Sequence, residues 1–251
     1  MPIDQRIATL DNDGTLWAEQ PIYFQVVFAL DRLKVLAAQH PEMRTEQPFK
    51  AALSEDLPAL AALGTKQLLE IIAATHAGMS IDRFTCAPTA SRPSSYQAAA
   101  SNSRGRGLAR RTAFHLSRCW VVGGLQFRMR PDGTPELVKL AKVEFADDGP
   151  GKPVGINRFI GRRPIFAFGN SDGDQQMLEW TAADSGASFM GLVHHTDAVR
   201  EWAYDRKSHV GRLDKALDEA TRRGWTVVDM KNDWKVIFPF EKDSVGSRAL
   251  Q

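Results

Sequence analysis

Most of the side chains that could support catalysis lie in two short loops. Each loop directly follows a short apolar run. Carboxylate and carboxamide oxygens are hard ligands that suit Mg²⁺ better than Zn²⁺. A carboxylate beside a bound cation can also act as a nucleophile or transfer a proton. The first loop supplies Asp11 and Asp13, and the second supplies Asn170, Asp172 and Asp174.

The elements that carry these loops follow from the apolar pattern. Residues 6–10 are mainly apolar and end abruptly in Asp-Asn-Asp-Gly, which is typical of a buried parallel strand opening into a loop. The second half alternates between predicted strands and helices, which indicates an α/β fold with a doubly wound parallel sheet. Ligands bind at the carboxyl ends of such strands. The predicted strands are residues 164–168, 187–193 and 225–230, and the predicted helices are 174–183 and 212–223, the last ended by Gly224.

A helical region is predicted directly after the first strand. Apolar residues recur at helical spacing over residues 21–40. Further helical segments are predicted around residues 57–63 and 68–72, closing near Gly78 as a helix C-cap.

The first loop carries a recognisable motif. Asp11-Asn12-Asp13-Gly14-Thr15-Leu16 resembles the first motif of the haloacid dehalogenase-like hydrolases, Asp-x-Asp-Gly-Thr-Leu. The resemblance implies that Asp11 attacks phosphorus to form an aspartyl-phosphate, while Asp13 protonates the leaving oxygen and then activates water. We expect Gly14 to turn the backbone with its amides toward the phosphate, and Thr15 to fix the loop. The structural alternative is an Asx turn that caps a helix.

The second loop resembles the last motif of the same family, in which an acidic pair binds magnesium. Asp174 takes the second acidic position and Asn170 takes the first, so the pattern is Gly-Asn-x-x-x-Asp. Mg²⁺ accepts a neutral carbonyl oxygen, so Asn170 can bind directly or through water, and Asp172 can supply the missing charge. Asp11 and the backbone carbonyl of Asp13 would complete the site. The alternative is a turn with a helix N-cap.

A basic residue is also implied by the resemblance. Lys152 precedes the strand at 164–168 by about the interval at which the family carries its lysine. This lysine bridges the nucleophile and the phosphate oxygens and offsets their negative charge.

The second motif of the family, a strand ending in Ser or Thr, is not evident. The only strand-like candidate, residues 120–122, ends in two glycines. It lies in residues 83–131, which contain nine arginines and no Asp, Glu or Lys. We hypothesise that a frameshift, misannotated splice or deletion replaced native sequence between about residues 84 and 120. In the alternative, a lineage variant, a hydroxyl such as that of Thr85, Ser101 or Ser103 reaches the site from a loop.

The order of motifs resembles the phosphoserine-phosphatase-like branch of the family. It implies a catalytic core of residues 1–16 and 120–251 and a helical cap of residues 17–82. Residues 83–119 form an anomalous Arg-, Ser- and Ala-rich segment, typical of disorder or of a wrong reading frame. The implied function is magnesium-dependent phosphomonoester hydrolysis on a small phosphorylated metabolite. The alternative is a non-catalytic relative that lacks the second motif.

Composition argues against several other classes. The net charge of +2 is too small to indicate nucleic acid as a partner. The sequence shows neither a membrane-spanning run nor a signal peptide, which predicts a cytoplasmic protein, although a leader upstream of this sequence stays open. Cys86 and Cys119 are interpreted as incidental thiols, and His194 and His195 as structural. The sequence does not indicate an oligomeric state.

Overall fold

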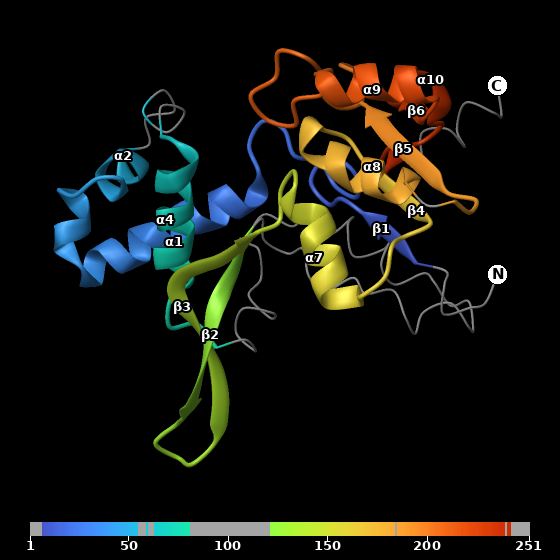
Figure 1. Cartoon of the computed structure of the whole chain (residues 1–251). Helices are drawn as coiled ribbons and strands as arrows, with labels where there is room; N and C mark the ends of the chain where they lie inside the picture. The colour runs from blue at the N-terminus through green and yellow to red at the C-terminus, as the bar shows by residue number, and fades with distance from the viewer. Residues whose placement is uncertain are drawn as a thin grey trace. The chain divides into compact units, whose positions relative to one another are not determined.

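The computed structural model describes residues 7–54, 59, 63–80, 121–183, 185–238, 240 and 241. These residues form two units (Figure 1). The first unit comprises residues 7–21 and 147–241, and the second comprises residues 22–80 and 121–146. Each unit has its own hydrophobic core.

A four-stranded parallel sheet forms the centre of the first unit. Its strands are β1 (Ala8–Leu10), β4 (Phe166–Gly169), β5 (Phe189–His194) and β6 (Thr226–Asp229), in the order β1-β4-β5-β6. All three pairings are parallel, so the prediction of an α/β fold with a parallel sheet is confirmed. Leu10 pairs with Phe168, so the loops that follow β1 and β4 begin side by side.

Helices flank this sheet in the order expected for crossover connections (Figure 1). They are α7 (Gly151–Ile160), the 3₁₀ turn η4 (Asp172–Asp174), α8 (Gln175–Ala182), α9 (Lys215–Arg223) and the short α10 (Met230–Asp233). The helix predicted at 212–223 corresponds to α9, which begins three residues later, at Lys215. It ends, as predicted, at Gly224, which takes the left-handed conformation with φ of 69°.

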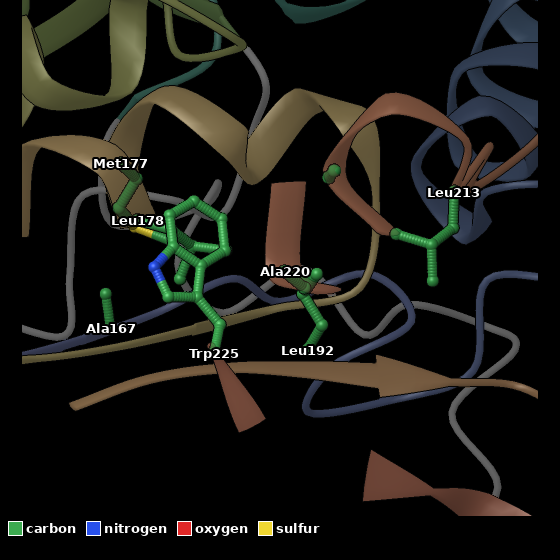
Figure 2. Packing of buried hydrophobic residues seen from close by; sticks show 8 residues of the cluster. Ala167, Met177, Leu178, Leu192, Leu213, Ala220 and Trp225 are labelled. Carbon is green, nitrogen blue, oxygen red and sulfur yellow. The ribbon is translucent and has the colours of Figure 1, made fainter. Parts of the chain in front are cut away.

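The sheet, α8 and α9 share one apolar core (Figure 2). Its buried members are Ala167, Met177, Leu178, Leu192, Leu213, Ala216, Ala220 and Trp225. Figure 2 shows the Trp225 indole beside the side chains of Met177 and Leu178. Complete burial of a leucine contributes roughly 1.5 to 3 kcal/mol, so this core stabilises the packing of α8 and α9 on the sheet.

The second unit contains the helices predicted after the first strand. They are α1 (Phe24–Gln39), η2 (Pro41–Arg44), α2 (Phe49–Leu53) and α4 (Thr65–His76). Ala29, Leu33, Ala52 and Ile71 form their core. Gly78 follows α4 with φ of 74°. Of the helix predicted at 57–63, the structure describes only residues 59 and 63, and it assigns helix only to residue 59. Among the described helices, none is both long and apolar enough to span a membrane.

A long antiparallel hairpin completes the second unit and differs from the sequence-based domain assignment. β2 (Val121–Met129) pairs with β3 (Pro135–Ala146), and β3 contacts α4. Residues 121–146 therefore belong with the predicted cap and not with the core, and the cap begins at residue 22 instead of 17. Residues 83–119, including both cysteines, lie outside the described residues, so the interpretation of that segment stays a prediction.

Candidate active site

The loop after β1 is a tight turn closed by its own backbone. The carbonyl of Asn12 accepts hydrogen bonds from the amides of Leu16 at 2.8 Å and of Thr15 and Trp17 at 3.2 Å each. The amide of Gly14 donates to the carbonyl of Trp17 at 2.7 Å. The amides of Gly14 and Thr15 therefore bond inside the loop, and the expectation that they face a phosphate is not met. Gly14 has φ of 75°, and a Cβ atom there would collide with Asn170.

Lys152 joins the two loops. Its Nζ donates to Asp11 Oδ1 and to Asp174 Oδ1, each at 2.5 Å. The side chain of Asp174 is fully buried, and those of Lys152 and Asp11 are 12% and 18% exposed. Three of the residues predicted from separate motifs, at positions 11, 152 and 174, therefore meet at one point in the first unit.

The surroundings of Lys152 explain why it lies there. It occupies the first turn of α7, where the helix dipole disfavours a cation. The two carboxylates compensate for this. Burial would lower the pKa of Lys152, but Asp174 and Asp11 hold it above its ordinary value. Lys152 is therefore an ammonium ion at neutral pH.

The surroundings of Lys152 also shift the pKa values of the neighbouring aspartates. Burial, reinforced by the charge of Asp174, raises the pKa of Asp11 to about 7 against the lowering effect of Lys152. Burial also raises the pKa of Asp147, with Asp148 and Asp174 adding to the rise. The site holds more acidic groups than Lys152 can neutralise, and a second cation would favour their charged forms.

Asp13 lies beside the nucleophile candidate and is held by an indole. Its Oδ1 accepts a hydrogen bond from Trp17 Nε1 at 2.6 Å, and the residue is 6% exposed. The bond is local, because the turn brings Trp17 back toward Asp13. Trp17 therefore fixes the orientation of the candidate acid–base residue.

The loop after β4 is organised around Asp174. Its Oδ2 accepts bonds from the backbone amides of Asn170 and Ser171 at 3.0 Å each and from Ser171 Oγ at 3.1 Å. Thr15, which we expected to fix the first loop, donates from Oγ1 to Asn170 Oδ1 at 3.1 Å. A carboxylate oxygen and a carboxamide oxygen thus belong to one connected network.

Asp172 has a different position from the one expected. Its Oδ1 accepts hydrogen bonds from the amides of Asp214 and Ala216, both at 2.9 Å. These amides begin α9, whose first N–H groups have no partners inside the helix. This geometry assigns Asp172 Oδ1 to capping the N-terminus of α9.

The remaining oxygen donors are compatible with Mg²⁺. Across the described ranges, no group of three or more His, Cys, Asp or Glu side chains is arranged to hold a metal ion. Mg²⁺ does not need such a cage, since one or two carboxylates, waters and substrate phosphate commonly suffice. Asp11, Asp174 and Asn170 supply hard oxygen donors, and the excess of acid in the site favours a cation.

Three residues that the sequence analysis did not place in the site lie behind it. Glu19 Oε1 accepts from Asn170 Nδ2 at 2.6 Å and from the hydroxyl of Tyr204 at 2.7 Å. His195 Nε2 lies 2.7 Å from the carbonyl of Gly14, which makes that nitrogen the donor. The sequence offers one signal for such a partner, because Asn170 stands where the resembled motif has a charged residue. Glu19 itself belongs to no periodic pattern.

The two adjacent histidines have different surroundings. His195 supports the site, and His194 lies near the surface. His195 is 3% exposed, and its Nδ1 lies 2.7 Å from Glu201 Oε2. Its ring stacks on Tyr204 with centroids 4.4 Å apart. His194 instead lies 3.5 Å from the partly exposed carboxylate of Asp205. The structural role predicted for the two histidines agrees with these contacts.

The described residues do not include a phosphate-binding hydroxyl at the end of the predicted strand. Val121 and Val122 pair with Ala146 and Phe145 in the hairpin, so these two residues do not continue the parallel sheet. The alternative donors Thr85, Ser101 and Ser103 lie outside the described residues.

Comparisons with known proteins add no assignment. No protein-family model matches the chain, and no curated protein sequence matches it. The motifs and the contacts that bring them together are therefore the basis for a functional assignment.

Proposed function

We propose that this protein is a magnesium-dependent phosphomonoesterase of the haloacid dehalogenase-like type, acting on a small phosphorylated metabolite. One observation carries the proposal: Lys152 Nζ lies 2.5 Å from both Asp11 and Asp174, which belong to two different motif loops. A solvated surface lysine or two unrelated turns would not account for this convergence. The α/β fold with its parallel sheet supports the proposal, and the proposed core is doubly wound with a helical cap after β1.

The proposed reaction uses each residue in turn. An oxygen of Asp11 attacks phosphorus, and the bond from phosphorus to the leaving oxygen breaks while Asp13 donates its proton to that oxygen. Asp13 then takes a proton from a water molecule, which attacks the aspartyl-phosphate and releases inorganic phosphate and free Asp11. Lys152 neutralises charge as the carboxylate and the phosphate approach.

Mg²⁺ would be held by Asp11, the backbone carbonyl of Asp13, Asn170 and Asp174. Bound there, it supplies positive charge that lets a carboxylate approach a phosphate dianion. The raised pKa of Asp11 supports this requirement, because burial and Asp174 disfavour the anionic nucleophile without a further cation.

The test is hydrolysis of a generic aryl phosphate with Mg²⁺ and with a chelator. We expect turnover only with Mg²⁺ and a loss of several orders of magnitude in Asp11→Asn. Asp218→Asn is a matched control, since that side chain is 69% exposed on α9. Circular dichroism verifies that each variant is folded. No turnover by folded wild-type protein would contradict the proposal and favour the non-catalytic relative.

A further inference from the structure

The residue at position 170 is neutral, although the resembled motif has an acid there. Asn170 stands where the resembled motif has an aspartate, so one negative charge is missing from the proposed magnesium site. Asp172 does not replace it, because its carboxylate caps α9. Glu19, which no motif includes, lies directly behind Asn170 with Oε1 2.6 Å from Asn170 Nδ2.

This contact determines the orientation of the carboxamide. Glu19 Oε1 accepts from both Asn170 Nδ2 and the Tyr204 hydroxyl, so the Asn170 NH₂ group faces Glu19. The carbonyl Oδ1 then points the other way, where Thr15 Oγ1 donates to it at 3.1 Å. Without Glu19 the amide could flip and present N–H groups, which cannot bind a cation, to the site.

Glu19 is itself held tightly. It is 3% exposed, and its Oε1 also accepts from the Tyr204 hydroxyl at 2.7 Å. Gly14 and Gly211 both have positive φ, and a Cβ atom at either position would collide with the Glu19 carboxylate. The nucleophile loop therefore packs directly on this side chain.

We infer that Glu19 is a positioning residue for the proposed magnesium site: its Oε1 accepts from Asn170 Nδ2 and so keeps the carboxamide oxygen Oδ1 turned away from Glu19. The inference rests on the proposed function for its link to magnesium. The orientation of Asn170 by Glu19 rests on the hydrogen bonds alone. An aspartate at position 170 would place two carboxyl groups 2.6 Å apart, so one of them would have to hold a proton.

A charge exchange tests the inference. The variants are Glu19→Ala, Asn170→Asp, Glu19→Gln and the double variant Glu19→Gln with Asn170→Asp, in which the glutamine amide can donate to the new carboxylate. Glu219→Gln, which removes a surface ion-pair partner on α9, is the control. The readouts are the urea unfolding midpoint without metal and the Mg²⁺ dissociation constant from titration calorimetry.

We expect Glu19→Ala to weaken Mg²⁺ binding by roughly 10- to 100-fold, as the loss of a supporting partner of a metal ligand does. Asn170→Asp should also weaken it, because one of the two facing carboxyl groups must hold a proton. Asn170→Asp alone should also lower the unfolding midpoint, and adding Glu19→Gln should restore both quantities. The inference is overturned if Asn170→Asp matches wild type beside Glu19, or if the double variant shows no recovery. If the unfolding midpoints show the expected coupling while wild type hydrolyses no aryl phosphate, the phosphatase proposal fails and the orientation of Asn170 by Glu19 is supported.

Discussion

Replacing Lys152 with methionine should destabilise the metal-free protein strongly. Lys152 Nζ is 2.5 Å from both Asp11 and Asp174, and at an effective dielectric constant of about 20 each attraction is worth roughly 7 kcal/mol before desolvation. Desolvation offsets much of this. Removal of one partner from a buried charge pair typically costs about 3 to 5 kcal/mol, and we expect that loss in the free energy of unfolding.

The loss should also depend on pH. Without the ammonium group, the two carboxylates face each other and the pKa of Asp11 rises further above its ordinary value. A raised carboxyl pKa means that the folded state holds a proton that the unfolded state releases, so stability falls as pH rises. The free energy of unfolding of Lys152→Met should therefore fall further below that of wild type at pH 8 than at pH 5.

The assay is urea unfolding with a chelator at both pH values, with Lys207→Met as the control. Lys207 is exposed, so its replacement should change stability by no more than about 0.5 kcal/mol. A loss for Lys152→Met as small as the control's, or one that is equal at both pH values, would refute the electrostatic account of this site.

Three further predictions concern the first unit. Leu178→Ala should lower the free energy of unfolding by about 2 to 5 kcal/mol in urea titrations, because Leu178 is fully buried, whereas Val199→Ala, 91% exposed, should change it little. Asp172→Ala should cost about 1 kcal/mol by uncapping α9, and the Mg²⁺ dissociation constant should stay unchanged. Backbone and side-chain bonds from Arg200 lower the pKa of Asp197 to about 2. The stability difference between wild type and Asp197→Asn should therefore be constant above pH 4 and disappear as pH falls toward 2.

The parallel sheet could be predicted because its two central strands are mainly apolar. Residues 164–168 and 187–193 are mainly apolar runs next to polar loops, and β4 and β5 lie within one or two residues of them. The end of α9 was predictable from one residue, since Gly224 adopts a left-handed conformation at little steric cost. Signals of this kind are local in sequence.

The hairpin was misinterpreted because the apolar run at 120–122 looks like a core strand. Its true partners, Phe145 and Ala146, are more than twenty residues away in sequence, and nothing local indicates them. The alternation of Leu125, Gln126, Phe127, Arg128 and Met129 is a period of two, which is typical of an antiparallel strand and could have indicated the hairpin.

Some residues of the candidate site could likewise be predicted from local sequence, and others could not. Asp11 and Asp174 were predictable from motifs, and Lys152 from its interval to β4. Glu19 was not, because its contact with Asn170 spans 151 positions and depends on the packing of two loops. The bond from Asp172 to the N-terminus of α9 was not predictable either, because spacing alone cannot show that its carboxylate turns toward those amides.

In the proposed reaction, Asp11 becomes phosphorylated. In Asp13→Asn the second step should stall, because no carboxylate activates water, while an aryl phosphate can still leave without a proton. Rapid mixing with Mg²⁺ should give a burst of one phenol per protein, and mass spectrometry should locate one phosphoryl group on Asp11. Two results would contradict this mechanism. One is a burst with the phosphoryl group on another residue. The other is hydrolysis by wild type while the variant shows neither a burst nor a modified Asp11.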